Sequence, residues 1–273
     1  MADHNDSVNV LDYTAPDGSY HEKVLDYLSE VIVNTGGSSN GGVVNKFGFN
    51  ADIDSAQAEV IASFGGTFNI MTTADTLDVV SDDINDTSGG AGARMILIAG
   101  IDENFLAIEE YVTMNGATPV TTVNSFLGVN RVVVISTGTA RVNVGIITLT
   151  DTGATVGTQA QIPEGASVTQ QCIYHTPIAR TFNLEFINIS GIKLAGGGAQ
   201  PEVNIKGYSF SRVTNTFYEV IDIQMDMARE NNIVLPYKNP ITFTGREVIY
   251  FTASTDTDNT KLSLRFSGAE TDS

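Results

Sequence analysis

This 273-residue chain has few of the residues from which common catalytic and metal sites are built. Cys172 is its only cysteine, which excludes an internal disulfide bond and any zinc or iron–sulfur site that needs several thiolates. Tryptophan is absent, and no apolar run approaches the roughly 18 residues of a membrane-spanning helix. Residues 1–9 lack the basic and apolar regions of an export signal. We therefore expect a soluble chain that is not exported and has no membrane partner.

Basic residues are also scarce. The chain has 14 Lys and Arg against 32 Asp and Glu, so its formal net charge is −18. A nucleic-acid groove needs clustered Lys and Arg to displace counterions from the phosphates. So few basic residues, spread over the chain, predict that neither nucleic acid nor an anionic membrane surface is a partner.

Glycine, threonine, asparagine and valine are plentiful, and this composition favours short strands joined by turns. Several segments alternate apolar and polar residues with the period of two that a strand requires. The apolar positions of three such segments are Phe182, Leu184 and Phe186; Phe217, Ile221, Ile223, Met225 and Met227; and Leu262, Leu264 and Phe266. The apolar residues before Gly207 are at odd-numbered positions and those after it are at even-numbered positions, which predicts a β-bulge. The fold class is therefore mainly β, with two antiparallel β-sandwich sections of jelly-roll-like type.

Three sections are predicted along the chain. Residues 1–45 form an N-terminal arm with an amphipathic helix at about 20–33, followed by a linker rich in Gly, Ser and Asn. Residues 46–160 form a first β domain, and residues 161–273 form a C-terminal jelly-roll-like β-sandwich. One short helix is expected within the first domain, from a capping box at Asp54 to the glycine pair at 65–66.

The helix of the arm carries an apolar stripe formed by Val24, Leu28 and Val31. A stripe of this kind must be covered, because an isolated helix of this length is marginal in water. Two alternatives remain open at this point: the helix folds back over its own sheet, or the arm reaches a neighbouring subunit. The stripe is thus a candidate interface.

The search for a catalytic site yields no candidate. Cys172 and His175 are the only thiol and imidazole close in sequence, and residues three apart on a strand point to opposite faces. The glycine clusters at 89–92 and 196–198 lack the spacing of phosphate-binding loops. We therefore predict a protein that is not an enzyme, with no catalytic, cofactor-binding or metal-binding residue.

Two acidic turns leave an alternative open. Asp82, Asp83 and Asp86 form one group, and Asp256 and Asp258 form another. Neither has the glycine and glutamate positions of an EF-hand loop. They are either solvated turns or weak cation sites.

Aromatic residues among exposed Thr and Asn positions form a second candidate interface. Tyr208, Phe217 and Tyr218 lie on predicted strands, where they suit contacts between subunits made by sheet faces and edges. They would equally suit a shallow sugar site.

Six segments match one family pattern in order and spacing. They are FGFNADID (47–54), GARMILIAGIDENF (92–105), VTMNGATPV (112–120), VNR (129–131), ASTDTDNT (253–260) and LSLRFSG (262–268). Over residues 46–268 the chain resembles virion structural proteins of tailed bacteriophages from aquatic environments. The arm and linker are not part of this pattern, and the tryptophan expected after Asp54 is missing.

The resemblance implies a bacteriophage virion protein without catalytic residues, present in many copies. Its expected role is capsid decoration on the particle surface, with the major capsid protein or other virion proteins as partners, and as a homo-oligomer, taken to be a trimer. The acidic composition favours an exterior position, because packaged DNA would repel it. The alternative is a tail or fibre component that contacts the host surface, for example through a glycan.

Overall fold

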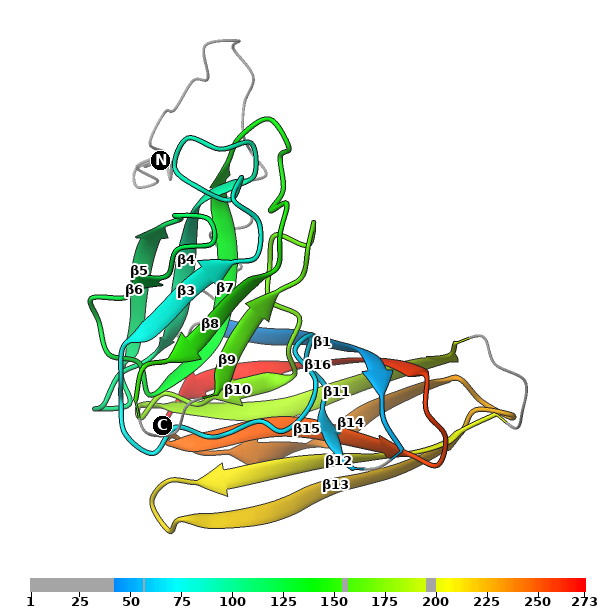
Figure 1. Ribbon diagram of the computed structural model, residues 1–273. Helices are drawn as coiled ribbons and strands as arrows, with labels where there is room; N and C mark the ends of the chain where they lie inside the picture. Colours follow the sequence, from blue (N-terminus) through cyan, green and yellow to red (C-terminus); the bar gives the residue numbers. More distant parts are fainter. Residues whose placement is uncertain (1–41, 56, 154–156, 195–199) are drawn as a thin grey trace, which may run out of the picture.

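A computed structural model describes residues 42–55, 57–153, 157–194 and 200–273 (Figure 1). The described part consists of antiparallel β-sheets and contains no helix, so the prediction of a mainly β protein is confirmed. The predicted helix at 20–33 lies outside the described residues. No helix in these ranges is long and apolar enough to cross a membrane.

The larger unit contains two sheets. The first has the order β1-β16-β11-β14, and the second has the order β10-β15-β12-β13, with β2 added beside β15. The strands of the first sheet are β1 (Gly42–Ile53), β16 (Thr260–Asp272), β11 (Arg180–Lys193) and β14 (Asn232–Phe243). Those of the second are β10 (Ile173–His175), β15 (Glu247–Thr255), β12 (Glu202–Ser211), β13 (Thr216–Asp226) and β2 (Glu59–Val60).

The antiparallel strand pairs of this unit are nested along the chain, with the first strand paired to the last and each further pair lying inside it. β12 pairs with β13, β11 with β14, β10 with β15, and β1 with β16. Inward-facing side chains from both sheets meet in one hydrophobic core. Among its fully buried members are Phe182, Phe243, Phe251 and Phe266, and the ring centroids of Phe182 and Phe266 lie 5.9 Å apart.

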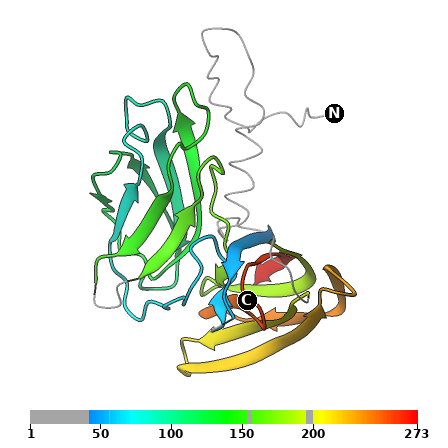
Figure 2. The ribbon, with the colours of Figure 1, turned by 45° about the vertical axis from the view of Figure 1, so that its right-hand side comes forward.

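The smaller unit also contains two sheets, formed by the chain between β2 and β10. One has the order β6-β3-β8-β9, with β6 (Val120–Thr121), β3 (Leu77–Ser81), β8 (Ile147–Asp151) and β9 (Thr158–Ile162). The other has the order β5-β4-β7, with β5 (Ala107–Thr113), β4 (Ala93–Ile101) and β7 (Gly128–Thr137). A second hydrophobic core joins these sheets around Phe126, Ile96 and Leu149. Figures 1 and 2 show the smaller unit standing on one end of the larger unit.

Strand pairing does not follow the predicted section boundaries. Residues 42–53, divided in the prediction between the arm and the first β domain, form β1 and pair with the last strand of the chain. The predicted helix after Asp54 is wrong. Its apolar residues instead enter β2 and the turns around it, where Ile61 N donates to Phe251 O at 2.9 Å.

Two bulges change which residues face the core. A register shift lies at Gly207/Tyr208, where Gly207 predicted it, but the extra residue is Val220 on β13. A second shift lies at Leu184/Phe186 and leaves Glu185 out of register on β11. As a result Phe217 and Phe186, expected on the core faces, are not members of the core, whereas Ile187 is fully buried.

Candidate functional site

The side chains of Cys172, which directly precedes β10, and His175, the last residue of β10, face opposite ways. Cys172 and Tyr174 belong to the main core of the larger unit. His175 faces the other way, where its ring centroid lies 6.3 Å from that of Phe68. The ring also packs so closely on Gly128 of the smaller unit that a Cβ there would lie 2.3 Å from it.

Neither side chain has the surroundings of a catalytic group. The Cys172 Sγ lies 3.1 Å from Leu264 O, and burial raises the pKa of the thiol far above its usual range. The thiolate that nucleophilic chemistry needs is therefore not formed. Burial lowers the pKa of His175 well below its ordinary value, so its imidazole is neutral. Its two ring nitrogens have no hydrogen-bond partner within the described ranges.

A buried lysine marks the junction between the two units. Lys46 on β1 is 3% exposed, and its Nζ donates a hydrogen bond to the backbone oxygen of Asn130 on β7. The same ammonium lies 6.0 Å from the centroid of the Tyr174 ring. Burial, with a contribution from the nearby Arg131 guanidinium, lowers the pKa of Lys46 to about 7. The junction thus holds an amine that is easily neutralised.

The two units are also joined by hydrogen bonds between side chains of one unit and backbone atoms of the other. The side chain of Asn130 clamps β10: its Oδ1 accepts from His175 N at 2.7 Å, and its Nδ2 donates to His175 O at 3.0 Å. Arg212 of the larger unit donates to Leu127 O at 3.1 Å and to Met71 O. Since these bonds are made to main-chain atoms on both sides, they fix the smaller unit on the larger one.

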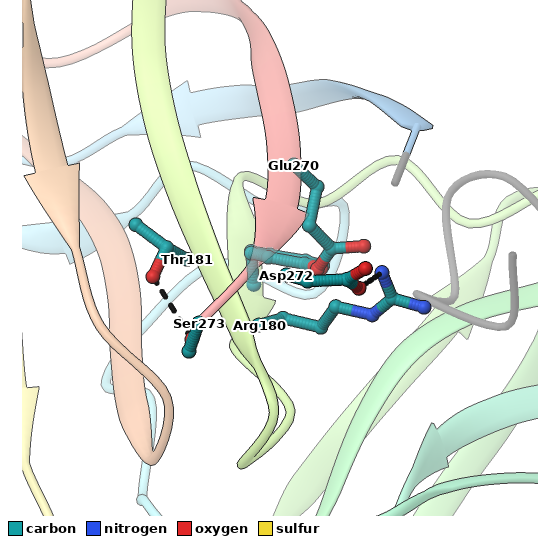
Figure 3. Close-up of polar contacts among 6 residues, drawn as sticks. Arg180, Thr181, Glu270, Asp272 and Ser273 are labelled. Carbon is teal, nitrogen blue, oxygen red and sulfur yellow. Dashed lines mark hydrogen bonds and ion pairs between the residues drawn. The ribbon is translucent and has the colours of Figure 1, made fainter. Parts of the chain in front are cut away.

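The end of β16 is also held by polar contacts (Figure 3). Arg180, at the start of β11, forms an ion pair with Asp272, and Thr181 Oγ1 lies 2.9 Å from Ser273 Oγ. Glu270 is buried and accepts a hydrogen bond from the Tyr174 hydroxyl. Burial raises the pKa of the Glu270 carboxyl. These contacts join three strands of the larger unit, β10, β11 and β16.

The acidic turn at Asp82–Asp86 is a structural cluster. Asp86 is completely buried and accepts four hydrogen bonds. The donors are Ser81 Oγ at 2.7 Å, Ala93 N at 2.6 Å, Val144 N at 3.0 Å and Gly145 N at 2.9 Å. This carboxylate therefore ties together the loops that follow β3 and β7.

The other predicted turn carboxylates also accept hydrogen bonds from backbone amides. Ile146, Asn85, Glu202 and Ser55 are the respective donors to Asp82, Asp83, Asp256 and Asp258, at 2.6, 2.7, 2.9 and 2.8 Å. The described residues contain no group of three or more His, Cys, Asp or Glu side chains placed to hold a metal ion. Only the Asn85 donor lies in the same turn, so the other three carboxylates join their turns to distant segments of the chain.

The predicted interface residues are only partly brought together. Val24, Leu28 and Val31 lie outside the described residues. Tyr208 and Phe217 lie on the outer face of the second sheet, where Tyr208 stacks on Tyr250 with ring centroids 5.4 Å apart and Phe217 packs on Phe210 at 4.6 Å. Tyr218 alternates with Phe217 and is 48% exposed, so the two aromatic side chains do not share a face.

A shallow groove of about 420 Å³ lies on the same sheet and was missed in the sequence. It is lined by residues of three neighbouring strands: 202–204 of β12, 224–226 of β13 and 254–256 of β15. Its polar side chains include Asn204, Gln224 and Ser254, which occupy one row across the strands. No sequence signal identifies these residues, because polar positions on a strand usually face solvent.

Comparison with known proteins yields little. No family model and no curated protein matches the chain. Among solved structures, one of infectious bursal disease virus, Gx strain, matches at 8% identity over 85% of this chain and 77% of that chain, with a TM-score of 0.18. The VP2 subviral particle of the same virus matches at 11% identity over 86% and 77%, with a TM-score of 0.15. A T13 particle of that virus matches at 11% identity over 91% and 76%, with a TM-score of 0.17.

Proposed function

We propose that this chain is a non-enzymatic structural protein of a bacteriophage virion that binds the capsid exterior and reinforces it. The observation that carries the proposal is the nested strand pairing of the larger unit. Numbered along the chain without the short β2, the eight strands of the larger unit form sheets of order 1-8-3-6 and 2-7-4-5, and these orders support the proposal of a jelly roll. Jelly rolls recur in viral capsid proteins and lectins, so this strand order suits a structural role in a virion.

Two further features support an exterior structural role. The thiol of Cys172 and the imidazole of His175 are buried and face opposite ways, and no described residue forms a hydrogen bond to either ring nitrogen of His175. The net charge of −18 would be repelled by packaged DNA but is tolerated on an outer surface. The partners are then the major capsid protein or other virion proteins, and the particle surface is the location.

The binding of added protein to particles tests this role. Particles that lack the protein are mixed with purified full-length chain and sedimented, and we expect the chain to co-sediment until the capsid sites are saturated. Binding that is confined to tails or fibres would favour the alternative of a tail component. Failure to bind any part of the particle would contradict the proposal.

The arm is proposed as the anchor to a neighbouring subunit or to the capsid. Its stripe of Val24, Leu28 and Val31 needs cover, and a linker rich in Gly, Ser and Asn separates it from the rest of the chain. Deletion of residues 1–41 is expected to leave a folded, soluble protein that no longer co-sediments with particles. Replacement of the three apolar residues by Ser in the full chain is the matched variant. If the truncated chain unfolds or aggregates, the arm belongs to the monomer's own core and the anchor proposal is wrong.

A further inference from the structure

The groove on the outer face of β12, β13 and β15 has the chemistry of a ligand site. Asn204 stands at its centre, opposite Gln224 on one side and Ser254 on the other. The flanking Val203 and Ile205 are buried in the core, so the Asn204 side chain faces outward. Two amides and a hydroxyl in one row present both donors and acceptors.

One atom in this row lacks a partner. Asn204 Oδ1 is shielded from water and accepts no hydrogen bond from any described residue. An unsatisfied polar atom of this kind lowers stability, since it has lost hydration without replacement. Because the oxygen is shielded, a ligand hydroxyl group would donate to it only after the Asn204 side chain had turned toward the groove.

An aromatic surface continues the same face of the sheet. Tyr208 lies four residues beyond Asn204 on β12, about 13 Å along the strand, and its ring stacks on Tyr250. Between them Lys206 forms a 2.7 Å ion pair with Glu219. A row of amides followed by aromatic rings suits a short chain of sugar rings, whose hydroxyl groups form hydrogen bonds and whose C–H faces pack on aromatic side chains.

The charge around the groove restricts the ligand further. Glu202, Asp226 and Asp256 also line it; Asp226 pairs with Arg229 at 3.2 Å, so the negative charge of the lining comes from Glu202 and Asp256. A sugar with carboxylate or sulfate groups would meet like charge and be rejected. These carboxylates are not placed to hold a metal ion, so they are acceptors for hydroxyl groups.

We propose that this groove binds a neutral oligosaccharide, with Asn204 and Gln224 forming hydrogen bonds to its hydroxyl groups and Tyr208 extending the contact. This site goes beyond the structural role proposed above. It would give the chain a carbohydrate ligand whether it is attached to the capsid or to the tail.

The test is an NMR titration of the full-length chain that follows the side-chain amide signals of Asn and Gln. The probes are maltose, cellobiose, lactose and diacetylchitobiose, with digalacturonic acid and calcium chloride as comparisons. We expect the Asn204 and Gln224 signals to shift with at least one neutral disaccharide and with neither comparison. Asn204→Ala should weaken this binding about tenfold, because it removes a donor and an acceptor.

Matched variants make the result decisive. Asn188→Ala changes an amide on the other sheet, where Asn188 Nδ2 donates to Asn232 Oδ1, and should leave sugar binding unchanged. Gln224→Ala on the edge strand β13 is a second groove variant, for use if Asn204→Ala does not fold. The proposal is overturned if no neutral disaccharide shifts these signals, if only calcium or the charged sugar does, or if groove variants bind as well as the unmodified protein. Loss of sugar binding would leave binding to particles intact, so the two proposals fail separately.

Discussion

Raising the pH from about 7 to about 9 is expected to stabilise the folded protein, because of Lys46. The pKa of this amine is about 7 in the fold, against its ordinary value of 10.5. Between these two values the unfolded chain binds a proton that the folded chain does not, so the free energy of unfolding rises with pH. Over two pH units the rise is about 2–3 kcal/mol, and it is measured by urea denaturation at each pH.

A pair of variants assigns this effect to Lys46. Lys46→Met keeps most of the buried side-chain volume but cannot titrate, so its unfolding free energy should change much less over the same pH range. Lys206→Met is the control, since the exposed Lys206 pairs with Glu219 and the hydrogen bond raises its pKa. It should retain the full rise. An equal pH dependence in Lys46→Met and the unmodified chain would show that the amine is not buried at the junction.

The second large effect is expected at Asp86. Asp86→Ala would leave three backbone N–H groups of the smaller unit without this acceptor, two of them buried and one partly buried. Each such group costs about 1–3 kcal/mol, so we expect a loss of at least about 3 kcal/mol in the free energy of unfolding. Thermal denaturation followed by circular dichroism measures it.

A neighbouring carboxylate provides the control for Asp86. Asp83 accepts local hydrogen bonds from the exposed Asn85, so Asp83→Ala should cost no more than about 1 kcal/mol. Asp86→Asn keeps the shape but replaces an acceptor oxygen with a donor, and should resemble Asp86→Ala. Similar small losses in all three variants would mean that the loops after β3 and β7 do not depend on this carboxylate.

The fold class can be predicted from the sequence, but the residues of each strand that face the core cannot. Alternation of apolar residues is a local property, and it correctly predicts strands at β11, β13 and β16. A bulge adds one residue and reverses the alternation beyond it. Gly207 gave a signal for one bulge, but the extra residue is Val220 on the partner strand, and Glu185 gave no signal at all. Simple alternation places Phe217 on the same face as Ile221, whereas the bulge at Val220 turns it to the opposite face.

Long-range pairing and the candidate sites were harder to predict. β1 pairs with β16 across more than 200 residues, and no local pattern records such a pairing. No local pattern distinguishes Lys46 from a surface lysine, because it is buried by contacts distant in sequence, among them Asn130 O and the Tyr174 ring. The groove likewise forms from Asn204, Gln224 and Ser254, which are polar strand residues brought side by side by the register.

The number of copies per particle tests the central proposal most directly. Quantitative mass spectrometry of purified particles, with isotope-labelled peptides of this chain and of the major capsid protein, gives the ratio of the two. A protein that decorates the capsid exterior must be present in hundreds of copies, in a fixed ratio to the capsid subunits. About a dozen copies, or a chain absent from purified particles, would contradict the proposal of capsid decoration.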